Sequence, residues 1–216
     1  MKTFFACLLF PLSVVAQAPV KIVDETSHDP SFKAFVSSLT TAVSKKDTAS
    51  LHMLLADSVW ESKDGCGNCP SREFITYLFG GESANKSWGE WSKVLRYGFY
   101  QINENQFFAP SFRKFLNEDS ALIVLGTNIP IYDHPGSQVI FRASYQQFDC
   151  DCYIVSQTEK TYVHLNQQMW HEIRFKDGRK GYVLEDQTSE GILREIQIKK
   201  IRGQWRIISF FQPPGC

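Results

Sequence analysis

The strongest local pattern in the chain is a hairpin signal across residues 170–183. Ile173 and Phe175 alternate there with charged residues, which is the two-residue period of a half-buried strand. Asp177 and Gly178 supply the turn, because glycine adopts a positive φ without a Cβ clash. The pattern predicts strand, tight turn, strand, and therefore a small β structure in this part of the chain.

A second strand-like segment, residues 126–137, runs into a Pro-Gly turn. Together with the hairpin it resembles the bacterial SH3 (SH3b) family over about 121–186. The residues that carry the resemblance are Asn128-Ile129-Pro130-Ile131, Pro135, Trp170, Asp177-Gly178 and Gly181-Tyr182-Val183. The resemblance implies a small β-barrel over 120–186, of a kind often appended to cell-wall peptidases. Tyr132 stands where the family pattern has Arg.

The first sixteen residues have the layout of a secretory signal peptide, with Lys2 ahead of an apolar run that ends near Ala16. The run is too short to span a bilayer, so no membrane span is expected in the mature chain. Cleavage near Ala16 would remove residues 1–16 and leave residues 17–28 as a polar leader of the mature chain. The segment predicts an exported protein, periplasmic or extracellular.

The net charge argues against two classes of partner. Removing residues 1–16 takes away Lys2 and no acidic residue, so 23 basic residues become 22, against 23 acidic ones. The resulting net charge of −1 offers no positive surface for nucleic acid or for an anionic membrane.

Helix signals fill the segment 29–119, which we interpret as a helical domain. Asp29 can cap free backbone N–H groups ahead of Pro30, and apolar residues follow at helical spacing from Phe32. The section 107–119 mixes aromatic and basic residues and is expected to be a connector. Three further helices are expected, beginning near Asp47, Ser71 and Ser87.

The last segment, 190–216, has a two-strand pattern that turns at Gly203. A lone hairpin is marginal in water, so it must pack on another part of the chain. We expect it to fold back on the helical domain, which makes 120–186 an insertion. The predicted fold class is α+β, an N-terminal helical part completed by a C-terminal β-hairpin, with an inserted SH3-like small β-barrel. The flanking parts are weakly similar to the NTF2-like fold.

Five cysteines remain after cleavage, and export favours disulfides among them. Cys66 and Cys69 have redox CxxC spacing, but the next predicted helix begins beyond both, so a structural loop disulfide is preferred. These two could alternatively join Cys150 and Cys152 in a four-thiolate zinc site or in cross-paired disulfides. Cys216 is the candidate for a free or intermolecular thiol.

Three histidines, His134, His164 and His171, fall within the barrel segment near acidic residues. Their spacing matches no metal-binding helix motif, and the chain contains no serine elbow, phosphate loop or dinucleotide fingerprint. We therefore expect no metal site, no cofactor and no enzymatic activity. The alternation with Trp170 predicts an exposed strand position for His171.

Aromatic residues are the remaining signal, because aromatic faces stack on sugars and grip extended or proline-rich peptides. For Trp170 and Tyr182 the alternative is a place in the barrel core, whereas Tyr132 precedes a turn and is expected to face solvent. The candidate binding residues are Tyr132, Asp133, His134, Tyr153, Trp170 and Tyr182.

The sequence thus predicts a non-catalytic binding module of the bacterial cell envelope. Its expected partner is a cell-wall peptide or glycan, or an envelope protein, bound through the barrel. Two alternatives stay open: a thiol, disulfide or structural zinc protein that uses the cysteine pairs, and a binding site in the helical domain with the barrel as its support.

Overall fold

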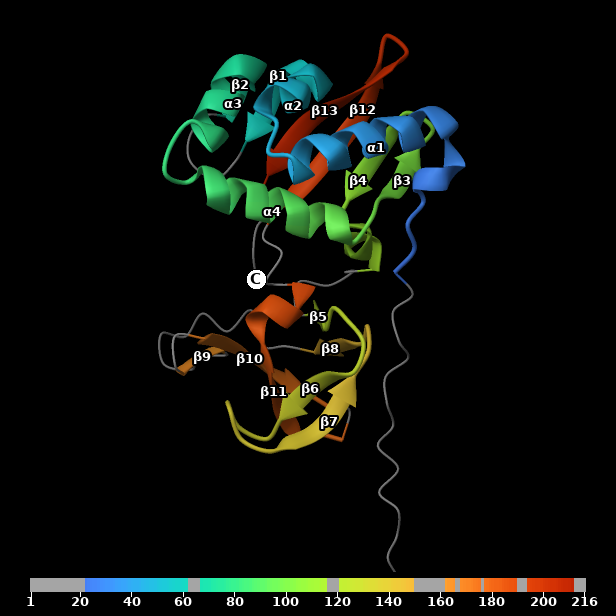
Figure 1. Ribbon diagram of the computed structural model, residues 1–216. Coiled ribbons are helices and arrows are strands. Elements are labelled where there is room, and N and C mark those ends of the chain that lie inside the picture. Colours follow the sequence, from blue (N-terminus) through green and yellow to red (C-terminus); the bar gives the residue numbers. More distant parts are fainter. Residues whose placement is uncertain are drawn as a thin grey trace, which may run out of the picture.

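The chain folds into two parts, which are drawn one above the other in Figure 1. The structure is a computed structural model, which describes residues 22–61, 67–115, 121–149, 162–165, 168–175, 177–189 and 194–211. The predicted signal peptide and the first residues of the leader lie outside these ranges. No helix of the described residues is long and apolar enough to cross a membrane.

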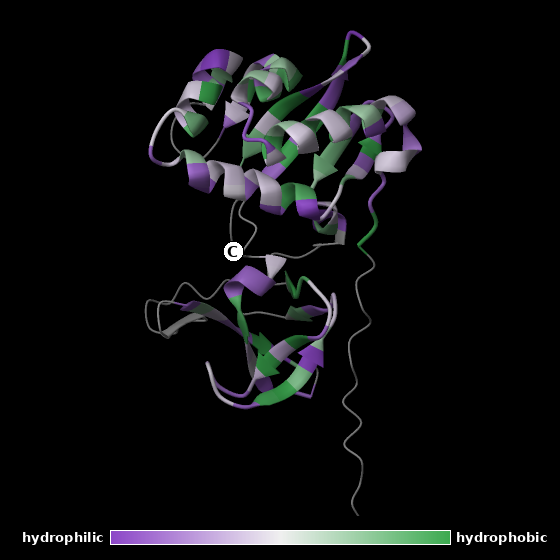
Figure 2. Ribbon diagram, viewed as in Figure 1, coloured by the Kyte–Doolittle hydropathy of each residue, from purple (hydrophilic) through white to green (hydrophobic). Residues whose placement is uncertain are grey.

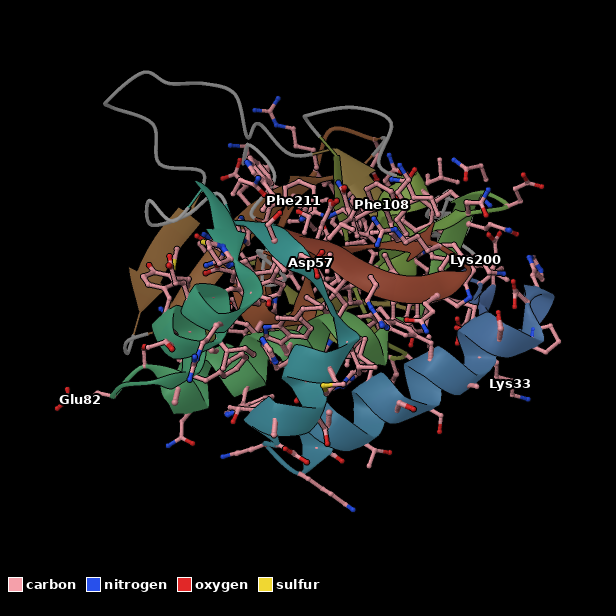
Figure 3. The ribbon with its side chains drawn as sticks, turned by 90° about the horizontal axis from the view of Figure 1, so that it is seen from above. Lys33, Asp57, Glu82, Phe108, Lys200 and Phe211 are labelled. Carbon is pink, nitrogen blue, oxygen red and sulfur yellow. The ribbon has the colours of Figure 1, made fainter. Side chains whose placement is uncertain are left out.

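The described α-helices of the first part lie on one face of a sheet (Figures 1 and 3). They follow a 3-10 turn, η1 (Thr26–His28), and are α1 (Pro30–Ser44), α2 (Thr48–Leu54), α3 (Ser71–Phe79) and α4 (Ala84–Arg96). The predicted cap at Asp29 is present: its carboxylate accepts bonds from the backbone N–H groups of Ser31 at 2.7 Å and Phe32 at 3.0 Å. Ser71 does not cap α3; its hydroxyl lies 3.1 Å from Nε2 of His52 instead.

The sheet of the first part places the C-terminal hairpin at its centre. Its strands are β1 (Leu55–Glu61), β2 (Gly67–Pro70), β3 (Tyr100–Asn103), β4 (Gln106–Ala109), β12 (Glu195–Ile201) and β13 (Gln204–Phe211), in the order β2-β1-β13-β12-β4-β3. The hairpin therefore does fold back on the helical part. The expected connector 107–119 instead begins with β4, because its short run Gln106–Ala109 pairs with β12, far along the chain.

Aromatic packing joins the helices to this sheet. The rings of Phe32 in α1 and Phe107 in β4 stack with centroids 3.7 Å apart, and Trp205 of β13 packs edge-on against both. Trp205 also donates from Nε1 to the hydroxyl of Ser31 at 2.9 Å. In Figure 2 the strands beneath the helices carry many hydrophobic residues, whereas the helices contain both hydrophilic and hydrophobic residues. The core fixes the helices at one face and leaves the other face of the sheet, with Phe108 and Phe211, away from them (Figure 3).

The second part is a sheet with an open strand order. It contains β5 (Ala121–Ile123), β6 (Ile129–Tyr132), β7 (Val139–Ala143), β8 (Gln147–Asp149), β10 (Gln168–Arg174) and β11 (Lys180–Leu184) in the order β5-β8-β10-β11-β6-β7, with β9 (Tyr162–Leu165) on β10. Two 3-10 turns flank it, η2 (Ser111–Phe115) and η3 (Glu185–Gln187). The predicted hairpin is β10–β11, with Glu172 opposite Tyr182.

The prediction of a closed barrel was wrong, because the sheet does not close among the described strands. The side of β5 that faces away from β8 is covered by η3 and the residues after it. Ile123 donates its backbone N–H to the hydroxyl of Ser189, and Leu125, just beyond β5, donates to the carbonyl of Gln187. β5 therefore cannot pair with β7, the strand at the other end of the order.

One short run joins the two parts. Leu122 and Val124 are buried in the small core of the second sheet, whereas Ile123 and Leu125 are buried in the core of the first part. Successive side chains along an extended backbone point to opposite sides. Two of these four residues therefore belong to the core of the first part, and the other two belong to the core of the second sheet. The second part is thus attached by shared apolar packing as well as by its connecting segments.

Candidate binding surface on the second sheet

The predicted binding residues fall on one face of the second sheet. Ile131, Ile173 and Val183 are buried in the small core, and their strand neighbours Tyr132 and Tyr182 therefore point to the opposite, outer face. The sheet register places Glu172, Tyr182, Tyr132 and Val139 side by side across four strands on that face. We call these four residues the outer-face row.

Two ring contacts extend the outer-face row. The imidazole of His134 stacks on Tyr182, with ring centroids 6.1 Å apart and planes 20° apart. Tyr132 meets Trp170 edge to face, with centroids 5.3 Å apart. His134 is the accessible member, with 79% of its side chain exposed. Sequence reasoning therefore brought together residues that the fold places in one cluster.

Trp170 differs from the other rings because it is only 3% exposed. Its indole Nε1 is also buried and has no hydrogen-bond partner among the described residues. Trp170 is therefore a packed residue that supports Tyr132, and its ring is not presented at the surface. It does not belong to the small core of the second sheet, so the alternative of a place in the barrel core is not borne out. Tyr132 and Tyr182 are half-buried.

Polar groups hold Tyr182 in place. Its hydroxyl donates to Oε2 of Glu172 at 2.9 Å, and Oε1 of the same carboxylate pairs with Nζ of Lys180 at 2.7 Å. Burial and this bond to the carboxylate raise the pKa of the Tyr182 hydroxyl, while the bond to Glu172 raises the pKa of Lys180. Tyr182 therefore stays a neutral, oriented phenol at neutral pH.

Asp133 has a structural role in the turn after β6. Its carboxylate accepts from the hydroxyl of Ser137 and, at 2.8 Å, from the backbone N–H of His134. The bond from Ser137 is the main reason why the pKa of Asp133 lies below its ordinary value. Asp133 thus positions the ring of His134, and its oxygens are already engaged by the protein.

His171 was predicted at an exposed position, and this was wrong. It pairs with Val183 of the small core, so it lies on the inner side of the sheet and is half-buried. Its Nε2 is buried without a hydrogen-bond partner in the described part of the chain, and burial lowers its pKa to about 4. His171 is therefore neutral at physiological pH and takes no part in the outer-face row. His164 lies in β9, and the placement of its side chain is outside the described residues.

The cysteine predictions are only partly covered by the described residues. Cys69 is buried in the core of the first part and is disulfide-bonded. A sulfur in a disulfide is not a thiolate ligand, so Cys69 does not serve a zinc site in this state. The other predicted residues that lie outside the described ranges are Cys66, Cys150, Cys152, Cys216 and Tyr153. Among the described residues, no group of three or more potential ligands could hold a metal ion.

Sequence reasoning missed a buried charge cluster in the first part. Nη1 of Arg194 pairs with Oε1 of Glu61, and its Nε lies 3.5 Å from Oε2 of Glu90 in α4. The side chain of Arg194 is 4% exposed and that of Glu61 is fully buried. Arg194 and Glu61 are 133 positions apart in the sequence, so no local pattern signals the pair. Arg194 lies where the chain re-enters the first part, just before β12, and its ion pair with Glu61 at the end of β1 is suited to holding that segment in place.

A second ion pair of the first part joins Nε of Arg113 to Oε1 of Glu195 at 3.0 Å. Burial raises the pKa of the Glu195 carboxyl, and the positive charge of Arg113 opposes that effect. The pair links η2 to β12 and thus the connector to the centre of the first sheet. Both clusters are consistent with structural roles.

Comparisons with known proteins give no family for the chain. No family model matches, and no curated protein matches. Several solved structures are similar over most of both chains, among them two proteins of unknown function. An NTF2-like protein of unknown function from Pseudomonas putida KT2440 has 7% identity, covers 88% of this chain and 87% of its own, and has a TM-score of 0.31. A protein of unknown function with a cystatin-like fold from Nostoc punctiforme PCC 73102 has 8% identity, covers 89% and 96%, and has a TM-score of 0.28.

Proposed function

We propose that this chain is an exported, non-catalytic binding module of the bacterial cell envelope. Its ligand is a cell-wall peptide or glycan, or a partner protein, and its SH3-like second part binds through the outer-face row and His134. The signal-peptide pattern of residues 1–16 supports export, and the absence of a catalytic motif from the sequence supports a binding role.

One observation carries the proposal: Tyr132, Tyr182 and His134 lie together on a single sheet face, with His134 exposed. Clustered rings offer a large apolar contact at low cost in side-chain entropy, and hydroxyl and imidazole groups add hydrogen-bonding partners. Glu172 and Lys180 fix the ring of Tyr182 before a ligand arrives, which lowers the entropic cost of binding.

A pulldown on purified peptidoglycan tests this function. His134→Ala is the main variant, because an exposed side chain can be removed without disturbing the core. We expect about tenfold or greater loss of retention, as for a central interface residue. Tyr132→Ala should act in the same direction, and its fold must be checked by thermal unfolding because Tyr132 packs on Trp170.

Tyr77→Ala is the matched control, because Tyr77 is an exposed tyrosine on α3 in the other part of the molecule. Retention of the wild type and the control, with loss in both His134→Ala and Tyr132→Ala, supports the proposal. Equal retention of all four proteins would reject the outer-face row and His134 as the binding site. No retention of the wild type would exclude peptidoglycan and leave a protein partner.

A further inference from the structure

The outer edge of β7 is not covered by any described strand of the second sheet. β7 is the last strand in the order, so one side of its backbone pairs with β6 and the other side has no strand among the described residues. Along an extended strand, alternate N–H and C=O groups point to either side. β7 therefore offers backbone donors and acceptors outward, in the plane of the sheet.

Three other strand edges among the described residues, those of β2, β3 and β5, are protected. At β3, Glu25 accepts from the backbone N–H of Gln101 at 2.7 Å, and Asp24 accepts from that of Phe99 at 3.1 Å. The edge of β5 is covered by the bonds from Ile123 to Ser189 and from Leu125 to Gln187, and β2 is four residues long and ends at Pro70. These are usual ways to block pairing with another chain.

β7 carries exposed apolar residues at positions where an edge strand usually has charged or covered ones. Val139 is 41% exposed and Ile140 is 37% exposed, and both lie on this edge strand. Exposed Arg142 is the one charged residue of the strand, and its guanidinium donates to the carbonyl of Asn128 at 3.1 Å. A register shift opposite Tyr132 locally disturbs the pairing with β6. The charge and the shift limit indiscriminate pairing without closing the edge.

The edge is continuous with the outer-face row. Val139 is the direct cross-strand partner of Tyr132, and Tyr132 is the partner of Tyr182. A strand added outside β7 would place alternate side chains on the outer face next to Val139, at the end of the row. Main-chain bonds would then supply affinity, and the neighbouring side chains would supply selectivity.

We propose that β7 binds an extended polypeptide segment as an added strand of the second sheet. The inference rests on the proposed function and narrows its ligand from peptide, glycan or protein to an extended peptide. A polypeptide is the ligand class that repeats both a donor and an acceptor at the strand rise of about 3.3 Å per residue. Val139 and Ile140 favour apolar residues in the part of the peptide that lies beside them, and Arg142 favours an acidic residue nearby.

The test uses a random dodecapeptide library selected on the wild-type protein, followed by affinity measurement of the enriched peptides. Ile140→Lys places a charge on the edge, and Ile102→Lys is the matched control at an exposed isoleucine of β3. We expect the enriched peptides to be rich in apolar residues. Their affinity for Ile140→Lys should be about tenfold or more lower than for the wild type, and their affinity for Ile102→Lys should be unchanged.

Hydrogen exchange supplies a readout that does not depend on any variant. A bound peptide should slow the exchange of outward-facing amides in Val139–Ala143, and peptides N-methylated at alternate residues should bind about tenfold or more weakly. The inference is overturned if no peptide is enriched, if Ile140→Lys binds equally well, or if β7 shows no added protection. A wild-type dimer that Ile140→Lys dissolves would also overturn it, in favour of pairing between two copies.

The outcomes separate this inference from the proposed function. Loss of peptidoglycan retention in His134→Ala, together with full retention in Ile140→Lys and no β7 protection, would keep the function and reject the edge. The reverse result, with peptide binding at β7 and no effect of His134→Ala or Tyr132→Ala on retention, would keep the edge and reject the outer-face row as the binding site.

Discussion

Replacing Arg194 with methionine should destabilise the first part far more than the loss of an exposed charge would. Arg194 and Glu61 are buried partners, so the Arg194→Met variant leaves the Glu61 carboxylate in an apolar interior without its guanidinium. Breaking a buried ion pair by removing one partner costs about 3–5 kcal/mol. The contact of the guanidinium with the ring of Phe210, at 5.1 Å, is lost as well.

The cost should be measured as a shift of the unfolding midpoint. For a chain of about 200 residues, 1 kcal/mol moves Tm by about 2–4 °C, so a loss of about 3–5 kcal/mol corresponds to about 6–20 °C. Urea unfolding followed by tryptophan fluorescence gives the free energy directly. Arg179→Met is the matched control, because Arg179 pairs with Asp177 with about half of each side chain exposed, and such pairs contribute about 0–1 kcal/mol.

A double variant decides between charge and packing as the cause. Glu61→Leu combined with Arg194→Met removes both charges, and buried pairs replaced by apolar residues are often neutral in stability. We therefore expect the double variant to be more stable than Arg194→Met alone. The reasoning is refuted if Arg194→Met unfolds within about 1 kcal/mol of the wild type, or if the two single losses simply add in the double variant.

Three smaller predictions concern the cap, a buried histidine and a tight glycine. Asp29→Ala should cost about 1 kcal/mol in urea unfolding, whereas Asp29→Asn keeps a capping oxygen and should cost less. Because burial lowers the pKa of His171 from 6.5 to about 4, the unfolded chain takes up a proton that the folded chain refuses. Stability should fall as pH drops from about 6.5 to about 4, by about 3 kcal/mol at most, and His171→Gln should flatten that part of the pH–stability curve. Gly181→Ala puts a Cβ 2.6 Å from Cγ2 of buried Ile131, so Tm should fall by the equivalent of about 1–3 kcal/mol, with the second sheet affected first.

Local sequence signals predicted much of the fold. Asp29 and Pro30 start α1 as expected, since cap chemistry acts within one turn of helix. The hairpin of Ile173 and Phe175 forms because its turn glycine and its two-residue period are both local properties. The aromatic cluster of Tyr132 and Tyr182 was also predictable, because alternation along each strand decides which residues can share a face.

Long-range choices were not predictable in the same way. β4 was missed because its strand signal is four residues long and its stability comes from pairing with β12, far along the chain. Trp170 and His171 are neighbours, and the sequence could not tell which of them faces the small core, since a shift of one residue exchanges the two sides. The pairing of His171 with Val183 puts His171, and not Trp170, on the side of the small core.

The sequence by itself determined the capped starts of the first two helices, the two hairpins and the set of residues that can meet on the outer face. Tertiary structure alone decided that the second sheet stays open, because the backbone of Ile123 finds Ser189 rather than another strand. It also decided that Glu61 meets Arg194, and that the run from Leu122 to Leu125 is divided between two cores. These contacts join segments distant in sequence, and their energy depends on the burial that only the folded chain creates.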